Sequence, residues 1–395
     1  MQSLEDFYRF MQQLQTARRD FAASCLAAIT DAQDIAVLEN ALHAIDKLPG
    51  SGDKRMLEVG GEPTPVVLDY ERRELERDIV FLDRTTQEFF QHLGTDHTGF
   101  SSAVEDCTRF LRNRSYASFI TDRDGTVNNY CGHYRSSHQP VYNAVVLSRF
   151  VSHVAGASVI LTSAPLEPHG IIDLTTMPER TVTLAGSKGR EYLAVDGRRG
   201  HKEVPQEQQS ALEELNGRID ALLRDPAHAP FALIGSGVQY KFGQTTVARQ
   251  DIHDSITQEQ SERFLETVTS VVRDVDPDGT TFAIEDTGKD IEIMLTVGGS
   301  REFSKGDGVA FLAQEVPIDF TLAGTHLVCG DTHSDVPMVE AVCERAGQSR
   351  TATVFVTTDE ELKRRVTATS TDCFFVDSPD VLITALNRVS TGMPQ

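Results

Sequence analysis

Short apolar segments separated by helical patterns constrain the fold of this chain more than any other feature. The segments have the length of buried strands and lie at residues 116–121, 157–162, 326–329, 351–356 and 373–376. Strands that alternate with helices pair in parallel through right-handed crossovers. The sequence therefore predicts an α/β fold with a Rossmann-like parallel sheet, and ligands bind such sheets beyond the carboxyl ends of the strands.

The 395 residues exceed the usual size of one hydrophobic core, and the pattern divides them into three predicted parts. Residues 1–112 form a helical N-terminal region, and residues 113–188 together with 300–395 form the sheet-containing core. Residues 189–299 form an inserted α/β cap. A cap over the strand ends would exclude water and select the substrate.

Two predictions concern the segments inside these parts. In the N-terminal region, Gly and Pro residues at 60–65 predict a turn or linker. In the cap, apolar runs at 191–196 and 231–235 predict strands. The N-terminal helices carry no recognisable chemistry, so we expect a packing or oligomerisation element, which could form a homo-oligomer or dock on a partner synthase.

Composition limits the partners and the compartment. The formal net charge of −22 argues against nucleic acid and against anionic membrane surfaces, which bind excess Lys and Arg. No segment resembles a signal peptide or reaches the apolar length that spans a bilayer. The six cysteines are scattered without a CxxC pair, which predicts reduced thiols and a cytoplasmic protein, with a disulfide between distant cysteines as the open alternative.

The first segment with chemical potential is residues 119–127, where Asp122 and Asp124 follow a strand. Two carboxylates at this spacing can face one pocket while Gly125 lets the chain turn. One carboxylate can attack phosphorus and the other can transfer protons. An acidic turn without function explains the pair alone equally well.

A second acidic segment follows the strand at 326–329. Asp331 comes directly after Gly330, and Asp335 lies at the start of a predicted helix. Magnesium prefers oxygen ligands and keeps several waters, so one or two carboxylates per segment suffice. Asp335 could alternatively be a helix N-cap. His333 is expected to be a loop residue and not a ligand.

Lys305 precedes an apolar helix that leads into the same strand. A lysine there can neutralise both a nucleophilic carboxylate and a phosphate. Taken alone, a surface lysine at a helix start is the commoner explanation.

Together these motifs, in this order, resemble the haloacid dehalogenase superfamily of phosphatases over about residues 115–390. Asp122-Arg-Asp-Gly-Thr126 matches the first motif, DxDGT. Ser163 best matches the strand-end hydroxyl of the second motif, with Thr162 as the adjacent candidate. Lys305 matches the third motif, and Gly330-Asp331 through Asp335 matches the fourth, GDxxxD.

The resemblance implies an Mg²⁺-dependent phosphatase with an aspartyl-phosphate intermediate. Asp122 would be the nucleophile, and Asp124 would act as the general acid and then the general base. Ser163 and Lys305 would hold phosphoryl oxygens. The implied magnesium ligands are the Asp122 carboxylate, the Asp124 backbone carbonyl, Asp331, and Asp335 directly or through water. Phosphoryl transfer depends mainly on such positioning and charge neutralisation.

The length and position of the insertion resemble the cap of the trehalose-6-phosphate phosphatase branch. The segments 185–191, 238–241 with 247–249, and 291–293 resemble stretches of that cap. The resemblance implies a sugar-phosphate substrate, with trehalose 6-phosphate first, and sugar-binding roles for Lys188, Lys241 and Glu292. Plain surface charge on cap strands is the alternative for these three residues.

The cap also departs from the branch. Lys188 replaces a histidine, Gln239 replaces a glutamate, and Val247-Ala-Arg249 replaces His-Tyr-Arg. Met294-Leu295 stands where the branch has Arg-Pro. Because buried polar groups discriminate strongly between substrates, a glucosylglycerol- or glucosylglycerate-type phosphate is a rival.

Two other classes of function are compatible with parts of this sequence, and Arg123 departs from the family pattern. A sugar phosphomutase would use the same residues with a bisphosphate activator, and a non-catalytic interaction protein would be expected to lack a catalytic residue. Arg123 replaces an aromatic residue between the two aspartates. If the segment stays extended, Arg123 points away from its neighbours and has a structural role.

Overall fold

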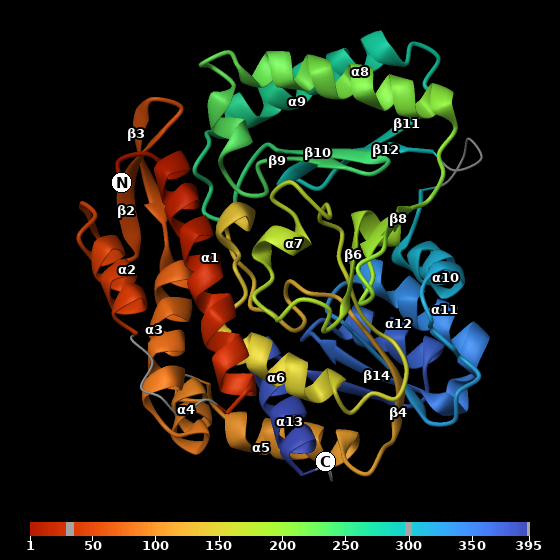
Figure 1. The fold of residues 1–395 in the computed structure, drawn as a ribbon. Coiled ribbons are helices and arrows are strands. Elements are labelled where there is room, and N and C mark those ends of the chain that lie inside the picture. Colours follow the sequence, from red (N-terminus) through yellow and green to blue (C-terminus); the bar gives the residue numbers. More distant parts are fainter. Residues whose placement is uncertain (29–34, 96, 297–301, 393–395) are drawn as a thin grey trace.

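The computed structural model describes residues 1–28, 35–95, 97–296 and 302–392. Three regions are visible in Figure 1: N-terminal helices, a large sheet flanked by helices, and a small sheet beneath two long helices. The α/β class and the helical N-terminal region are thus confirmed. In the described part of the chain, no helix combines the length and the apolar character needed to cross a membrane.

The N-terminal region consists of helices and one small sheet. The helices are α1 (Leu4–Leu26), α2 (Ala36–Asp46), α3 (Asp69–Asp83), α4 (Thr86–Leu93) and α5 (Phe100–Leu111). A capping box starts α1, because Ser3 Oγ accepts a hydrogen bond from the Asp6 N–H and the Asp6 carboxylate accepts one from the Ser3 N–H. One face of α1 buries Leu4, Phe7 and Met11. That buried stripe matches the helical spacing in the sequence.

The predicted linker is instead a small antiparallel sheet of β1 (Gly50–Ser51), β2 (Lys54–Val59) and β3 (Glu62–Val67). Gly60 and Gly61 both have positive φ and form a two-residue hairpin turn. The prolines of β3 are tolerated because β3 is an edge strand of this sheet. The sequence prediction treated Gly and Pro as chain breakers and missed the pairing of β2 with β3.

An eight-stranded sheet forms the core of the molecule. Its order is β15-β14-β13-β4-β5-β6-β7-β8, parallel from β15 to β6 and antiparallel at β7 and β8. The strands are β4 (Tyr116–Thr121), β5 (Ser158–Leu161), β6 (Thr183–Gly186), β7 (Glu191–Leu193), β8 (Arg199–His201), β13 (Thr325–Gly330), β14 (Thr351–Val356) and β15 (Cys373–Val376).

Helices cover both faces of this sheet. They are α6 (Val141–Val151), α7 (Ile171–Leu174), α10 (Lys305–Glu315), α11 (Val336–Ala346), α12 (Glu360–Thr369) and α13 (Pro379–Thr391). Alternating residues of β4 face opposite layers: Phe119 packs with α6 and α13, and Ile120 packs with α10 and α11. Burial on both faces explains why the core strands are uninterrupted apolar runs in the sequence.

The inserted unit is a four-stranded antiparallel sheet of order β11-β12-β10-β9 with two long helices. Its elements are α8 (Gln206–Leu223), β9 (Val238–Lys241), β10 (Gln244–Ala248), α9 (Gln258–Val275), β11 (Phe282–Asp286) and β12 (Asp290–Leu295). Figure 1 shows α8 and α9 on the side of this sheet that is remote from the core. The other side of the sheet therefore faces the core.

One strand prediction in this unit is wrong, and another places a real strand in the wrong sheet. Residues 191–196 were expected in the cap, but β7 pairs with β6, so the core sheet continues past residue 188 to His201. The run 231–235 is not a strand, because Ala229–Ala232 forms a 3₁₀ turn with Pro230 near its start. Its apolar character reflects packing, since Phe231 stacks on Phe264 at 3.8 Å between ring centroids.

Candidate active site

The carboxyl ends of β4, β5 and β13 meet at one edge of the core sheet. The backbone N–H of Asp122 donates to the carbonyl of Cys329 at 3.0 Å, which ties the end of β4 to the end of β13. A cavity of about 330 Å³ lies over this edge, between the core and the small sheet. Of the predicted site residues, its walls include Asp122, Asp124, Ser163, Lys241, Glu292, Lys305 and Asp331.

Lys305 lies at the centre of the charged groups. It is the first residue of α10, whose N-cap Ser304 accepts a hydrogen bond from the Asp307 N–H. The Lys305 Nζ lies 2.9 Å from Asp122 Oδ1 and 2.5 Å from Asp335 Oδ1. Burial alone would lower the pKa of Lys305, but the charges of Asp122 and Asp335 raise it above its ordinary value. Lys305 is therefore a fixed positive charge beside Asp122.

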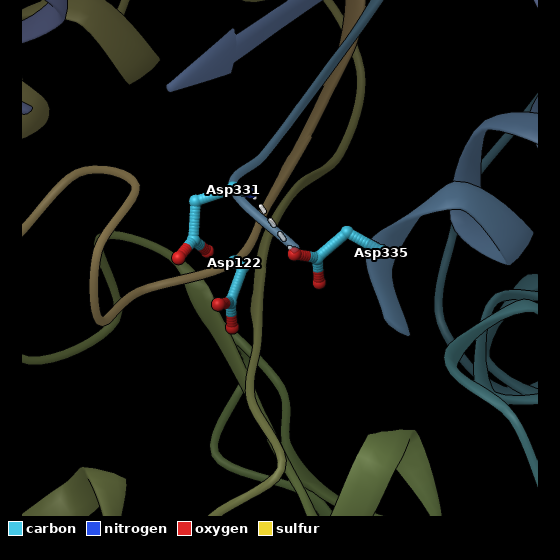
Figure 2. Close-up of side chains that lie close together, drawn as sticks. All are labelled: Asp122, Asp331 and Asp335. Carbon is cyan, nitrogen blue, oxygen red and sulfur yellow. Dashed lines mark hydrogen bonds between the residues drawn. The ribbon is translucent and has the colours of Figure 1, made fainter. Parts of the chain in front are cut away.

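Asp122, Asp331 and Asp335 form the group of carboxylates in Figure 2, with oxygen atoms within 4.8 Å of one another. Burial raises the pKa of Asp122 to about 6. Burial and then the charges of Asp122 and Asp335 raise the pKa of Asp331 to about 9. The cluster thus concentrates negative charge that a cation would offset, and its all-oxygen donors fit Mg²⁺.

Asp335 differs from the other two carboxylates because the protein already uses both of its oxygens. Oδ1 accepts from Lys305, and Oδ2 accepts from the backbone N–H groups of Asp331 and Thr332 at 3.0 and 2.9 Å. Burial raises the pKa of Asp335, but Lys305 and these N–H groups outweigh it and hold the pKa below its ordinary value. The geometry favours a role in holding Lys305 and the loop after β13 over direct metal contact.

The turn after Asp124 requires glycine for two reasons. Gly125 has φ +82°, in the left-handed region that favours glycine. A Cβ at this position would also lie 2.2 Å from Asp331 Oδ2. The absence of a side chain therefore lets the two acidic segments approach each other.

Thr162 and Ser163 both line the cavity at the end of β5. Thr162 Oγ1 accepts a hydrogen bond from the Ala164 N–H at 3.3 Å, so it stabilises the local turn. This arrangement favours Ser163 as the hydroxyl available to a ligand.

Strand alternation explains the polar face of the small sheet. In β12, Ile291 and Ile293 pack in the apolar core of this unit, so Glu292 and Asp290 project to the opposite side and line the cavity. Lys241 of β9 lines it too and is 6% exposed. Gln239 and Thr246 form a cross-strand pair in the same wall. This face thus offers carboxylates, an ammonium group, an amide and a hydroxyl.

Lys188 is the predicted substrate-binding residue that the structure places apart from the cavity walls. Its Nζ donates to Glu302 and lies 3.9 Å from Glu292 Oε2. These partners hold Lys188 at the junction between the core and the small sheet. A direct contact between Lys188 and the substrate stays a prediction, and in the structure its ammonium group lies beside the cavity-lining Glu292.

Arg190 makes a second link at this junction, which the sequence prediction missed. Its guanidinium donates to the carbonyl of Gly243 at 2.5 Å, in the turn between β9 and β10. The guanidinium also lies over the Phe303 ring, 4.7 Å from its centroid. Arg190 is buried, so this contact ties the small sheet, which forms the roof of the cavity, to the core.

The prediction that Arg123 points away from its neighbours is wrong. Its guanidinium is 3% exposed and donates to Asp124 Oδ1 at 2.5 Å. The strand ends at Thr121 and the chain turns, because the N–H groups of Val127 and Asn128 both donate to the carbonyl of Arg123. The alternation expected of an extended segment therefore does not apply there.

Two family models match this chain. A family model described as trehalose-6-phosphate phosphatase, C-terminal, matches residues 119–382. A model of the trehalose-6-phosphate phosphatase N-terminal helical bundle domain matches residues 3–97. The chain belongs to the trehalose-6-phosphate phosphatase family. The N-terminal helices are thus a recognised part of this family and not an unrelated addition.

Individual relatives align with nearly the whole chain. A trehalose-phosphatase of Brugia malayi is 30% identical over 98% of this chain and 86% of its own length. An α,α-trehalose-phosphate synthase [UDP-forming] 2 of Caenorhabditis elegans is 31% identical over 99% of this chain and 34% of its own. The chain spans about a third of the length of the first curated relatives it matches. The solved C-terminal domain of a C. albicans trehalose-6-phosphate phosphatase is 12% identical, covering 73% of this chain and 96% of that chain, with a TM-score of 0.47.

Proposed function

We propose that the protein is a phosphatase that hydrolyses a sugar phosphate, with trehalose 6-phosphate as the first candidate substrate. The observation that carries the proposal is the position of Lys305 between Asp122 and Asp335, in a cavity that Asp331 also lines. A fixed cation beside a buried carboxylate is what attack on a phosphate dianion requires. Family membership and the name of the Brugia malayi relative support the substrate class.

Asp122 is the proposed nucleophile. Its pKa of about 6 leaves it ionised at neutral pH, and Lys305 holds its Oδ1. The other oxygen attacks phosphorus, the bond from phosphorus to the ester oxygen breaks, and a phosphoryl group is transferred to Asp122. Lys305 and Ser163 bind the phosphoryl oxygens and offset the charge that develops on them.

Asp124 is the proposed proton donor and acceptor. It protonates the departing sugar oxygen, and then removes a proton from the water that attacks the aspartyl phosphate. This second attack releases inorganic phosphate and restores Asp122. Asp124 lines the same cavity, although its carboxylate lies outside the cluster of Asp122, Asp331 and Asp335.

The acidic cluster is the proposed magnesium site. Asp122 and Asp331 would hold the ion, together with the Asp124 backbone carbonyl, while Asp335 would act through Lys305 and the loop. When bound, magnesium supplies positive charge to the transferring phosphoryl group and orients it. Asp331 would have to lose its proton to bind the ion.

The small sheet is the proposed cap that selects the substrate. The cap begins after His201, where β8 ends, and its last strand, β12, ends at Leu295. Glu292, Lys241 and Gln239 would bind sugar hydroxyls on the cavity roof. Gln239, which replaces a glutamate of the family pattern, is the specific reason to retain glucosylglycerol- and glucosylglycerate-type phosphates as second candidates. Exchange of a carboxylate for an amide changes which hydroxyl donors are satisfied.

Two further proposals concern the setting of the enzyme. The six cysteines are all free thiols, which favours a reducing compartment such as the cytoplasm. The first relatives are named as synthases and are about three times as long as this chain, which supports contact with a partner synthase.

A phosphate-release screen with Mg²⁺ tests the proposed function. Trehalose 6-phosphate, phosphorylated glycosyl-glycerols and glycosyl-glycerates, and simple hexose phosphates would be compared at equal concentrations. We expect hydrolysis of a glycoside phosphate, and loss of that activity in Asp122→Asn. A preference for simple hexose phosphates over every glycoside phosphate would contradict the substrate class, and near-normal turnover by Asp122→Asn would contradict the mechanism.

A further inference from the structure

The loop that follows the catalytic turn connects Asp124 to the N-terminal helices. Arg123 Nη1 donates to Asp124 Oδ1 at 2.5 Å and to Ser137 Oγ at 3.2 Å, while Nη2 donates to the Ser137 carbonyl. Ser137 Oγ donates to Asp124 Oδ1 at 3.0 Å. Arg123 and Ser137 are 3% and 1% exposed, so solvent competes little for these contacts.

Both hydrogen bonds to Asp124 end on the same oxygen. Two donors on Oδ1 fix the rotation of the carboxylate and leave Oδ2 for proton exchange with a substrate. Arg123 has a planar guanidinium that reaches Asp124 and the Ser137 backbone together, a geometry that lysine cannot reproduce. The pair therefore determines where the proton of Asp124 is presented.

Helix α3 of the N-terminal region holds the segment that carries Ser137. The Tyr70 hydroxyl donates to the carbonyl of His138 at 3.2 Å and accepts from Asn128 Nδ2 at 3.1 Å. The hydroxyl of Ser136 donates to Glu71 Oε1. Asn128 and His138 flank the loop on either side of Ser137, so α3 supports both of its ends.

We propose that Arg123 and Ser137 are positioning residues for Asp124, and that α3 of the N-terminal bundle maintains this arrangement through Tyr70. This inference rests on the proposed phosphatase function. It gives the N-terminal bundle a part in catalysis beyond packing, because the bundle sets the geometry of the proton-transfer step. None of these contacts involves the cavity roof, so substrate recognition by the cap is a separate matter.

The leaving group distinguishes a positioning role from a general structural one. A sugar alkoxide needs a proton as it departs, whereas p-nitrophenolate leaves without one. Loss of Asp124 orientation should therefore reduce kcat/KM for a sugar phosphate much more than for p-nitrophenyl phosphate. A variant that merely loosens the fold would reduce both values by the same factor.

The experiment compares kcat/KM for trehalose 6-phosphate, or the sugar phosphate that the screen ranks first, with that for p-nitrophenyl phosphate. For Arg123→Ala we expect a loss of about 10²-fold on the sugar phosphate and under about 5-fold on the aryl phosphate. Arg123→Lys should recover part of the loss, since it keeps the charge without the fork. Ser137→Ala, a smaller change, should give about a 10-fold difference between the two substrates and remains informative if Arg123→Ala does not fold.

A double-mutant cycle adds a second readout. If Arg123 acts through Asp124, then Arg123→Ala should have little further effect on the sugar phosphate in an Asp124→Asn background. Independent effects that multiply would overturn the proposal. Equal losses on the two substrates, or no loss in either single variant, would overturn it as well.

Tyr70→Phe tests the contribution of the N-terminal bundle. We expect a selective loss of about 3- to 10-fold on the sugar phosphate. The matched control is Tyr116→Phe, which removes an equally buried hydroxyl that donates to the Leu111 carbonyl at 2.7 Å at the opposite end of β4. Equal behaviour of these two variants would overturn the assignment to α3. A wild-type protein that hydrolyses neither ester would instead overturn the proposed function, and this inference with it.

Discussion

Replacement of Glu71 by glutamine should change how the stability of the protein depends on pH. Glu71 lies in the first turn of α3, is 1% exposed, and accepts hydrogen bonds from the Ser136 hydroxyl and the Cys131 thiol. Burial raises the pKa of Glu71 from 4.5 to about 7, although the Ser136 hydrogen bond opposes this shift. His133 Nδ1 lies 3.9 Å away but brings no charge at neutral pH, because burial lowers its pKa to about 4.

The size of the effect follows from linkage. A carboxyl pKa raised from 4.5 to about 7 corresponds to about 3 kcal/mol of differential stability. Because the folded pKa lies above the unfolded one, this stability is fully present below pH 4.5 and is lost as pH rises through 7. Glutamine does not titrate. The unfolding free energy of Glu71→Gln minus that of the wild type should therefore increase by about 3 kcal/mol between pH 4.5 and pH 8.

The assay is denaturant unfolding of both proteins at several pH values across this range. Comparison of the two proteins at each pH removes the contributions of all other titrating groups that they share. Glu76→Gln, on the same helix but 39% exposed at its side chain, is the control for an exchange of glutamate on the surface of α3. A difference between Glu71→Gln and the wild type that stays constant from pH 4.5 to pH 8 would refute the reasoning, because it would show that burial does not raise the pKa of Glu71.

Three further predictions concern the cavity. Lys305→Met should reduce kcat for sugar-phosphate hydrolysis by about 10²- to 10³-fold, because the cation beside Asp122 is lost; phosphate release measures this, and near-normal turnover would contradict it. Asp331→Asn should remove the stabilisation that bound Mg²⁺ gives the wild type, which is about 2.7 kcal/mol when the Mg²⁺ concentration is about 100 times its dissociation constant. The measurement is the rise in melting temperature on addition of MgCl₂. A rise in Asp331→Asn as large as in the wild type would exclude Asp331 from the magnesium site. Gly243→Ala should raise KM, because a Cβ there would lie 1.8 Å from the Arg190 guanidinium and would displace the contact that ties the small sheet to the core. The control is Gly279→Ala, at a glycine that has a similar positive φ but no atom within 4 Å of the added Cβ. It should lower stability by only the backbone strain of about 1–2 kcal/mol and leave KM unchanged.

Local patterns were sufficient to locate the groups at the sheet edge. The apolar run before Asp122 matches β4, and the run before Asp331 lies within β13. Strands of a parallel sheet present their carboxyl ends at one edge, so both carboxylates were expected at that edge, and the pairing of β4 with β13 makes them neighbours. Lys305 was predictable for the same reason, because the helix it starts returns the chain to β13.

The errors arose where distant segments decide the structure. The prolines of β3 were compatible with a strand only because β3 is a sheet edge, and Glu191–Leu193 joined the core only because β6 was available to pair with it. The ion pair of Lys188 with Glu302, more than a hundred residues away in the chain, also could not be read from local sequence.

By itself, the sequence determined the class of fold, the order of the motifs and the residues at the strand ends, since each depends on periodicity within a few residues. Only the tertiary structure decided how those residues are held. Arg123 contacts Asp124 because the chain turns after β4 and brings Ser137 beside it, and Tyr70 supports that loop from a helix that precedes it by more than fifty residues. Such contacts depend on how separate elements pack, which no local pattern records, and they connect the N-terminal bundle to the catalytic turn.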